Sequence, residues 1–376
     1  MNYLISGGGT GGHIFPAVSI ANALKELDSQ ANILFVGALG RMEMERVPQA
    51  GYRIVGLPVQ GFNRKQPWKN VRVVINMLRS MRMVKGIIRD FRPDVGIGVG
   101  GYASGAAMKQ AAKMGVPILL QEQNGFAGVT NKLLKDDAAV ICVAYEGMER
   151  FFPKEKIILT GNPVRQNLLG GSRSEAFDYF RKEHQIAFDP ARKTVLIIGG
   201  SLGARTINEA VMQGLPQLDS LNVIWQTGKN YYDDCAAQLD QRPAQQRTST
   251  VCITPFLARM DLAYAAADVV ISRAGASSIS ELCLLGKPAI LVPSPNVAED
   301  HQTHNAMALV RKDAAILVRD SEASRTLIPT LLQTINDDQR CTDLHNHILS
   351  LAQPDSARRI AEQVISLAQH NKQQNK

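Results

Sequence analysis

Residues 1–16 read MNYLISGGGTGGHIFP, and this stretch decides the class of fold. Tyr3–Ile5 is a short apolar run, and the glycine-rich turn Gly7–His13 follows it directly. A helix is expected next, because Pro16 suits a first helical turn and apolar residues recur at helical spacing over Ala17–Leu27. A strand, a glycine-rich turn and a helix in this order predict the first unit of a parallel α/β sheet.

The same plan repeats along the chain, where short apolar runs alternate with helical patterns. The predicted strands are Tyr3–Ile5, Ile33–Val36, Ile54–Val59, Val95–Gly98, Ile118–Gln121, Val140–Val143 and Ile157–Thr160 in the first half, and Val195–Ile198, Val223–Gln226, Val251–Ile253, Val269–Ser272, Ala289–Val292 and Ile316–Val318 in the second. This alternation predicts an α/β protein with two doubly wound, Rossmann-like sheets.

Two domains are expected, because 376 residues exceed the size at which one hydrophobic core stops growing. The strand pattern pauses at 161–174, where GNPVR runs into a Gly-Gly-Ser stretch. We therefore predict domains at 1–164 and 165–356, with a last helix over 357–376 that packs back on the first domain. Two such domains should face each other across a cleft at the carboxyl ends of their strands, where these sheets bind ligands.

The composition limits which partners, which cellular compartment and which kind of membrane contact are expected. Lys and Arg number 42 against 34 Asp and Glu, and the net charge of +8 suits an anionic partner or a basic surface without a specific partner. The five cysteines form no C-x-x-C pair, which favours a reducing cytoplasm over a zinc site. No apolar stretch reaches the roughly 18 residues of a membrane span, so any membrane contact should be peripheral.

The first glycine-rich turn has the spacing G-x-G-x-x-G at Gly7, Gly9 and Gly12. A dinucleotide-binding half would also carry an acidic residue at the end of its second strand, to hold the ribose. Here that strand, Ile33–Val36, ends in Gly-Ala-Leu-Gly. The sequence therefore disfavours a nicotinamide dehydrogenase, and leaves open whether the turn binds a phosphate or only connects a strand to a helix.

Two further turns of small residues lie in the second half, at Gly199–Ala204 and Arg273–Glu281. Either turn can offer backbone N–H groups and a helix end to a phosphate, or can simply open a strand–helix unit. Glu281 has two interpretations as well. It completes a capping box with Ser278, or it binds ribose hydroxyls beside a diphosphate. Three such turns favour a phosphate ligand.

Seven motifs then occur in order: GGGTGGHIFPA, GVGGYASG, QEQNGFAGVTNK, GNPVR, GGSLGA, SRAGASSISE and EDHQTHNA. Together they resemble the MurG family, the peptidoglycan N-acetylglucosaminyltransferases of the GT-B fold. The resemblance implies inverting transfer of N-acetylglucosamine from UDP-N-acetylglucosamine to the 4-hydroxyl of undecaprenyl-diphospho-muramyl-peptide, with no cofactor. It also implies a peripheral location at the cytoplasmic face of the bacterial inner membrane, with anionic lipid and other wall-synthesis and division proteins as partners, and no nucleic acid.

By that resemblance the N-terminal domain receives the lipid acceptor and the C-terminal domain the donor. The implied donor contacts are Thr10, Gly11, Gly12, Asn124, Arg165, Ser201, Leu257, Ala276, Ser277, Ser278, Ile279, Ser280, Glu281 and Gln302. Among them the backbone of Leu257 would read the uracil edge, and Asn124 and Gln302 would touch the sugar. His301 stands where family members carry Gln, which leaves its role open.

An inverting transfer needs a base for the acceptor hydroxyl and positive potential for the departing diphosphate. His13 is the predicted base, since an imidazole has an ordinary pKa of about 6.5, and Asn124 is the second predicted catalytic residue. The chain has no D-x-D, so we expect no metal. The leaving group should instead contact the helix that begins near Ser277, and Arg273, unless Arg273 pairs with a structural carboxylate.

A basic segment, Arg64–Arg89, combines apolar residues at helical spacing with many cations and no acidic residue. This pattern is typical of a helix that lies on anionic lipid. The predicted membrane face comprises Trp68, Lys65, Lys69 and Arg72, and the residues expected in the core are Val74, Leu78 and Met81.

Two other functions fit the same residues. One is a UDP-N-acetylglucosamine epimerase of the same fold, which would need no lipid acceptor. The other is a non-catalytic subunit that binds nucleotide sugar and recruits a partner to the membrane. Release of UDP only in the presence of lipid acceptor would exclude the epimerase, and turnover by the purified protein would exclude the subunit.

Overall fold

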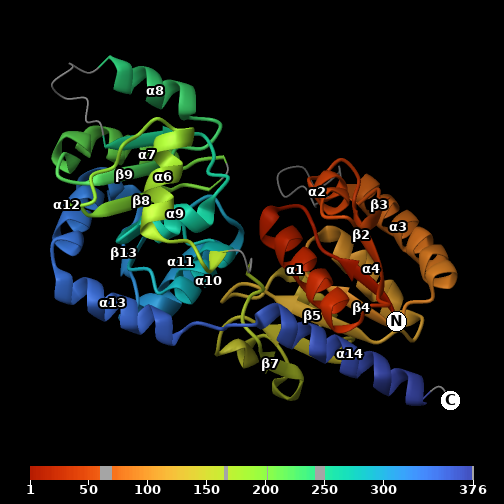
Figure 1. The fold of residues 1–376 in the computed structure, drawn as a ribbon. Helices are drawn as coiled ribbons and strands as arrows, with labels where there is room; N and C mark the ends of the chain where they lie inside the picture. Colours follow the sequence, from red (N-terminus) through yellow and green to blue (C-terminus); the bar gives the residue numbers. More distant parts are fainter. Residues whose placement is uncertain (60–69, 165–167, 201, 242–249, 375–376) are drawn as a thin grey trace. The chain divides into compact units, whose positions relative to one another are not determined.

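The computed structural model describes residues 1–59, 70–164, 168–200, 202–241 and 250–374, with the backbone alone for Asn70, Arg72, Ala298 and Gln374. The chain divides into two compact units, Met1–Val164 with Gln353–Lys376, and Arg165–Ala352 (Figure 1). The second unit therefore ends at Ala352 and not at residue 356. The reason is local bonding: Arg359 donates to Gln353 Oε1 and to the carbonyl oxygen of Leu159, which ties the segment after Ala352 to the first unit.

The first unit is built on one parallel sheet in the order β3-β2-β1-β4-β5-β6-β7. Its strands are β1 (Asn2–Ser6), β2 (Asn32–Ala38), β3 (Arg53–Leu57), β4 (Val95–Gly98), β5 (Ile118–Glu122), β6 (Val140–Val143) and β7 (Ile157–Leu159). The strand order reverses between β1 and β4. In sheets of this kind, ligands bind at the carboxyl ends of the strands beside that reversal.

Two hydrophobic cores cover the faces of this sheet, because successive side chains of a strand point to opposite sides. Tyr3 and Ile5 lie in one core, and Leu4 lies in the other. The helices that contribute to the first core are α1 (Gly11–Leu27), α2 (Glu43–Gln49) and α14 (Ser356–Gln374). Those that contribute to the second are α3 (Asn70–Phe91), α4 (Tyr102–Lys113) and α5 (Val129–Leu134).

The last helix, α14, packs against α1 in the first unit, as Figure 1 shows. Its buried residues, which include Ile360 and Val364, join the core that contains Tyr3 and Ile5. The buried side of the predicted last helix, over 357–376, therefore closes this core.

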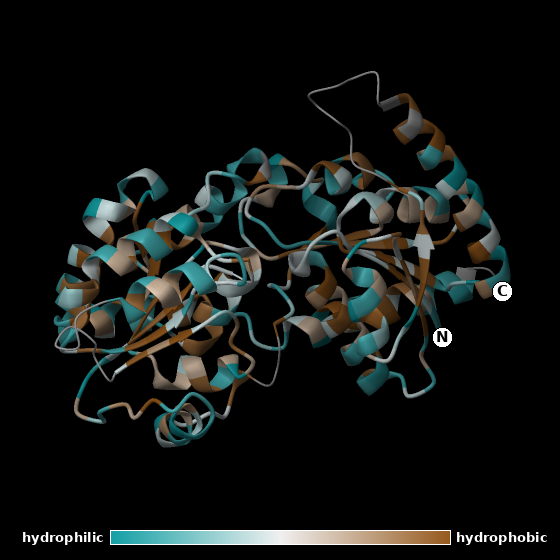
Figure 2. Cartoon of the chain, turned by 90° about the horizontal axis from the view of Figure 1, so that it is seen from above, coloured by the Kyte–Doolittle hydropathy of each residue, from teal (hydrophilic) through white to brown (hydrophobic). Residues whose placement is uncertain are grey.

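The second unit repeats the plan with the parallel order β10-β9-β8-β11-β12-β13. Its strands are β8 (Thr194–Ile198), β9 (Asn222–Gln226), β10 (Val251–Thr254), β11 (Val269–Ser272), β12 (Ala289–Leu291) and β13 (Ile316–Leu317). Its helices are α6 (Arg173–Glu183), α7 (Arg205–Gly214), α8 (Tyr232–Asp240), α9 (Met260–Ala266), α10 (Ala276–Leu285), α11 (His301–Val310), α12 (Ala323–Ile335) and α13 (Asp338–Ser350). In Figure 2 the strands of both units are mainly brown, in keeping with their burial between helices.

Each predicted strand overlaps an observed one, and the predicted α/β class with two Rossmann-like sheets is confirmed. One local expectation was wrong. Pro16 lies inside α1 and not in its first turn, because the helix begins at Gly11. The polar segment after Ser172 contains α6, which begins with a capping box formed by Ser172 and Glu175.

The core side of α3 was also predicted wrongly. Val74 and Leu78 are exposed, whereas Val73, Val84 and Ile88 are buried. The two sets differ by a rotation about the helix axis, and only the packing of α3 on the sheet decides between them. Met81 does pack against the core. Trp68, Lys65 and Lys69 lie outside the described residues, as does the side chain of Arg72.

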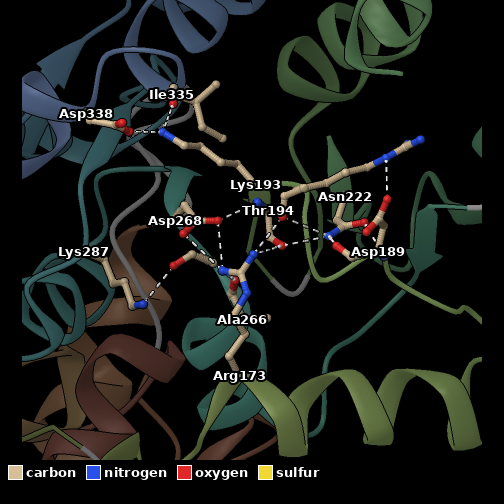
Figure 3. A network of polar contacts seen from close by, with 12 residues as sticks. Arg173, Asp189, Lys193, Thr194, Asn222, Ala266, Asp268, Lys287, Ile335 and Asp338 are labelled. Atoms are coloured by element: carbon tan, nitrogen blue, oxygen red, sulfur yellow. Dashed lines mark hydrogen bonds and ion pairs between the residues drawn. The ribbon is translucent and has the colours of Figure 1, made fainter. Parts of the chain in front are cut away.

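A polar network closes the amino-terminal edge of the second sheet (Figure 3). Arg173 contacts the Asp268 carboxylate at 3.0 Å and donates to the carbonyl oxygen of Arg192. Asp268 also accepts the backbone N–H of Thr194, the first residue of β8. Lys287 donates to the carbonyl oxygen of Ala267, and burial lowers the pKa of its ammonium group. These charges stabilise the sheet at the edge opposite its strands' carboxyl ends.

No helix in the described ranges is both long enough and apolar enough to cross a membrane.

Candidate active site

The glycine-rich turn of the first unit lies between β1 and α1, beside the reversal of strand order. Thr10 is the N-cap residue of α1, and Gly11, Gly12 and His13 form its first turn. Thr10 Oγ1 lies 3.1 Å from His13 Nδ1. The predicted base and its neighbour are therefore in direct contact, and His13 is half-buried.

A second glycine turn, which follows β4, makes room for the imidazole. Gly100 has φ +98°, and a Cβ built on it would lie 2.5 Å from His13 Nε2. A Cβ on Gly101, at φ +91°, would lie 2.5 Å from the carbonyl oxygen of Gly8. Any larger residue in these two places would collide with the first turn, so the GVGGY motif serves the close approach of two loops.

A buried carboxylate that the sequence analysis missed holds the first turn. Glu43, at the start of α2, is fully buried. It accepts the backbone N–H of Gly9 at 2.9 Å and that of Ala38 at 3.0 Å. A Cβ on Gly8 would lie only 2.1 Å from its Oε1. An acidic residue does therefore follow the second strand, five residues after Ala38, but it binds the protein's own backbone.

This contact changes the interpretation of the G-x-G-x-x-G spacing. In a phosphate-binding turn the backbone N–H groups point at the ligand. Here the N–H of Gly9 is already bonded to a carboxylate. The turn therefore positions Thr10 and His13. A Cβ on Gly8 would collide with Glu43 and one on Gly7 would lie 2.9 Å from Cβ of Val99 in the neighbouring loop, whereas Gly9 is required by its φ of +87°.

Asn124 follows β5 and is held by a second buried carboxylate, Glu122. Glu122 accepts the backbone N–H groups of Asn124 at 3.1 Å and of Gly128 at 2.9 Å, and the side-chain amide of Asn131 at 2.9 Å. Burial raises the pKa of this carboxyl, and these hydrogen bonds oppose the rise. Asn124 is thereby fixed at the carboxyl edge of the sheet that also carries His13.

The loop after β5 is joined to the loop after β4 through Gln123. Its side-chain amide donates to the carbonyl oxygen of Val99 at 2.9 Å, beside Gly100. Its own carbonyl oxygen accepts the side-chain amide of Asn162, at the far end of the sheet edge, at 2.9 Å. The loops that carry Asn124 and that contact His13 therefore form one hydrogen-bonded edge.

In the second unit the helix α10 starts at Ala276, directly after β11 and Gly275. Ser277 and Ser278 lie in its first turn, and Gly275, the N-cap residue, provides no side-chain cap. The proposed capping box is therefore wrong, because Ser278 is inside the helix rather than before it. Ser280 Oγ donates to the carbonyl oxygen of Ala276, and Ile279 is buried. Backbone N–H groups of the first turn remain the groups suited to a phosphate.

Glu281 lies in the second turn of α10 and is 7% exposed. Its Oε2 accepts the hydroxyl of Tyr264, from α9, at 3.0 Å. Tyr264 was not recognised from the sequence, because the two residues come from different helices.

Gln226, at the end of β9, links two loops of the second unit. Its side chain accepts the backbone N–H of Leu257 at 3.0 Å and donates to the carbonyl oxygen of Gly200 at 3.1 Å. The backbone of Leu257 was expected to read the uracil edge, and its N–H is bonded within the protein. The Gly199–Ala204 turn lies beside the strand reversal between β8 and β11.

Arg273 pairs with a structural carboxylate, which the sequence had left as an open alternative. Its guanidinium contacts the carboxylate of Asp320 and donates to the carbonyl oxygens of Val292 and Pro293. Its charge is therefore already neutralised within the second unit. Gln302, on α11, accepts the backbone N–H of Ser294 at 2.8 Å, which fixes its side chain at the loop after β12.

The structure does not explain the role of some predicted site residues. Arg165 and Ser201 lie outside the described residues, and His301 begins α11. Within the described part of the chain, no three His, Cys, Asp or Glu side chains are grouped so that they could hold a metal ion.

Two family models match the chain. One describes the glycosyltransferase family 28 N-terminal domain and matches residues 3–143, and the other describes the family 28 C-terminal domain and matches residues 194–364. A Bacteroides fragilis protein named UDP-N-acetylglucosamine--N-acetylmuramyl-(pentapeptide) pyrophosphoryl-undecaprenol N-acetylglucosamine transferase is 57% identical, over 99% of this chain and 97% of its own length. A Porphyromonas gingivalis protein of the same name is 50% identical, over 100% and 98%.

Solved structures of other proteins also resemble this chain. The crystal structure of Acinetobacter baumannii MurG is similar with a TM-score of 0.78 and 27% identity, over 97% of this chain and 99% of that one. A UDP-GlcNAc 2-epimerase from Neisseria meningitidis, solved with UDP-GlcNAc, has a TM-score of 0.66 at 14% identity and covers 97% and 100%, which is a likeness of fold alone.

Two Rossmann-like parallel sheets, each with small-residue turns at its strand reversal, define the class of GT-B glycosyltransferase folds. The chain belongs to glycosyltransferase family 28 and, within it, to the MurG family.

Proposed function

We propose that this chain transfers N-acetylglucosamine from UDP-N-acetylglucosamine to the 4-hydroxyl of an undecaprenyl-diphospho-N-acetylmuramyl peptide, in peptidoglycan synthesis. The observation that carries this proposal is 57% identity, over 99% of the chain, to a transferase of that name. His13 and Asn124 lie at the carboxyl edge of the first sheet and Glu281 follows a strand of the second, and sheets of this kind bind ligands at that edge.

The first unit supplies the base. As the 4-hydroxyl oxygen bonds to C1 of N-acetylglucosamine, its proton passes to His13 Nε2, and the bond from C1 to the diphosphate breaks. Thr10 stabilises the reactive tautomer by accepting from Nδ1–H, which leaves the lone pair on Nε2. Asn124, oriented by Glu122, donates to the transferred sugar.

The second unit holds the donor. Glu281 binds the ribose hydroxyls, and N–H groups of the first turn of α10 stabilise the charge that develops on departing UDP. Arg165, Ser201, Gln302 and the Leu257 backbone complete the donor site in this proposal. Arg273 contributes through its position beside β11 rather than as a free cation, because it is paired with Asp320.

A membrane face on α3 would bring the enzyme to its lipid acceptor. Val71, Ile75 and Leu78 are 66%, 59% and 58% exposed, on a helix that carries Arg79, Arg82 and Lys85. Val129 and Leu133 of α5, on the same side of the sheet, are exposed as well. Exposed aliphatic side chains among cations suit the headgroup region of an anionic bilayer. We therefore place the protein peripherally at the cytoplasmic face of the inner membrane, where other wall-synthesis and division proteins would meet it.

One assay tests the proposed function. The purified protein is given UDP-N-acetylglucosamine and a muramyl-diphospho-lipid analogue, with and without a chelator. UDP should appear only when the acceptor is present, and the chelator should not abolish turnover, because the helix end replaces a metal. UDP formation or sugar epimerisation without acceptor would favour the epimerase, and no turnover at all would favour a binding subunit.

A further inference from the structure

The carboxylate of Glu281 is held by a residue to which no role has been assigned. Tyr264 is 1% exposed, and its hydroxyl donates to Glu281 Oε2 at 3.0 Å. Glu281 itself is 7% exposed. A carboxylate that is this deeply buried needs hydrogen-bond donors from the protein, and the tyrosine supplies one.

The contact joins the helix that precedes one strand in the sequence to the helix that follows it. Tyr264 lies on α9, β11 follows, and Glu281 lies on α10, so the strand at the reversal of the sheet connects the two partners. The backbone of Tyr264 is fixed as well, because its carbonyl oxygen accepts the N–H of Ala267 at the end of α9. The hydroxyl is therefore presented to Glu281 from a rigid element.

A glutamate side chain ends in a soft torsion, so an unrestrained carboxylate samples many orientations. A donor on one oxygen restricts that rotation before any ligand arrives. A carboxylate that accepts two neighbouring hydroxyls must lie in one plane with them, and prior orientation lowers the free-energy cost of binding. The phenol is neutral, so it orients Glu281 without removing its negative charge.

We propose that Tyr264 is a positioning residue that makes the second unit selective for a ribonucleoside diphosphate over its deoxy analogues. The proposal rests on the proposed function, in which Glu281 binds the ribose. Tyr264 is buried and contacts the carboxylate, so its effect should be confined to ligands that carry the ribose hydroxyls.

The test compares UDP with 2′,3′-dideoxyuridine diphosphate, by calorimetric titration of the full chain. Tyr264→Phe removes one oxygen and keeps the buried ring. It should weaken UDP binding about tenfold, the scale of one hydrogen bond to a charged group. Binding of the dideoxy analogue should stay unchanged. Tyr179→Phe, which removes a hydroxyl from a partly buried tyrosine of the same unit, is the matched control and should change neither affinity.

Glu281→Gln separates the two assignments. If Glu281→Gln removes the preference for UDP and Tyr264→Phe does not, Tyr264 has no positioning role while the ribose role of Glu281 stands. If the wild-type protein shows no preference, the ribose role fails and the present proposal fails with it. If Tyr264→Phe lowered the affinity for UDP and for the dideoxy analogue equally, the tyrosine would only support packing, which also overturns the proposal. In the Glu281→Gln background, Tyr264→Phe should have no further effect.

Discussion

The hydroxyl oxygen of Thr10 lies 3.1 Å from Nδ1 of His13, within the first turn of α1. A neutral imidazole has one protonated and one unprotonated nitrogen, and the partner of one nitrogen decides the state of the other. When Thr10 accepts a proton from Nδ1, Nε2 is left as the basic atom. Nε2 is the atom beside Gly100, where the missing side chain leaves space.

Replacement of His13 should affect the reaction and not donor binding. His13→Ala is expected to lower kcat by about 10²-fold or more, the usual scale for loss of a general base. UDP affinity, measured by titration, should stay near that of the wild type. His370→Ala, on the exposed surface of α14 in the same unit, is the control. A His13→Ala protein with a nearly normal rate would exclude the assignment.

Thr10 should act through His13. Thr10→Val keeps the shape of the side chain but removes the hydroxyl, and kcat should fall by about five- to tenfold, the scale of one hydrogen bond. Thr10→Ser keeps a hydroxyl and should retain most of the rate. The alternative from the family resemblance, in which Thr10 contacts the donor, instead expects weaker UDP binding in Thr10→Val, so kcat and the UDP dissociation constant distinguish the two.

Glu43 should be necessary for the shape of the glycine-rich turn. Glu43→Gln places an amide N–H₂ where the backbone N–H of Gly9 or Ala38 now donates, which costs about 1–3 kcal/mol of stability per unsatisfied group. We expect a lower melting temperature and a lower kcat, with UDP affinity unchanged. Glu45→Gln, an exposed change on the same helix, should alter none of the three. Normal kcat in Glu43→Gln would show that the turn keeps its shape without this carboxylate.

Glu281 should matter for ligand affinity more than for folding. Glu281→Ala should weaken UDP binding by about tenfold or more, since charged hydrogen bonds to the ribose are lost. Ser278→Ala should leave the melting temperature unchanged, because α10 begins at Ala276 and Ser278 does not cap it. If a lower melting temperature were the only defect of Glu281→Ala, Glu281 would have a structural role and would not bind UDP.

The exposed aliphatic side of α3 should bind lipid. The double change Ile75→Ser and Leu78→Ser should reduce sedimentation with anionic liposomes by about tenfold or more, since each side chain loses the burial of an aliphatic group. Transfer to the lipid acceptor should slow while UDP affinity stays intact. Leu349→Ser, at an exposed leucine of the second unit, is the control. Unchanged sedimentation would show that this side of α3 does not bind lipid and that any membrane face lies on another surface.

Charge reversal at Lys65, Lys69 and Arg72 remains a prediction of the sequence. Lys65 and Lys69 lie outside the described residues, as does the side chain of Arg72. If these cations meet anionic lipid, their replacement by Glu should make liposome binding weaker and less sensitive to salt.

Much of the fold was predictable because its signals are local. Runs such as Val95–Gly98 and Val140–Val143 are observed strands with the same bounds, since each run is buried and bounded by turn residues. The helical periodicity of α3 was also visible, but its buried side was not. Apolar residues occur on more than one side of that helix, and only contact with α4 and the sheet selects Val84 and Ile88 over Val74 and Leu78.

The site divides in the same way. Sequence alone determined the order of strands, turns and helices, the small residues of the three turns, and the positions of His13, Asn124 and Glu281 after their strands, because these depend on neighbours along the chain. Only the tertiary structure decided which polar groups meet: Glu43 with Gly9, Tyr264 with Glu281, and Asp320 with Arg273. Each pair joins segments that are separate in the sequence, and their contact depends on how helices pack on a sheet, which local periodicity does not encode.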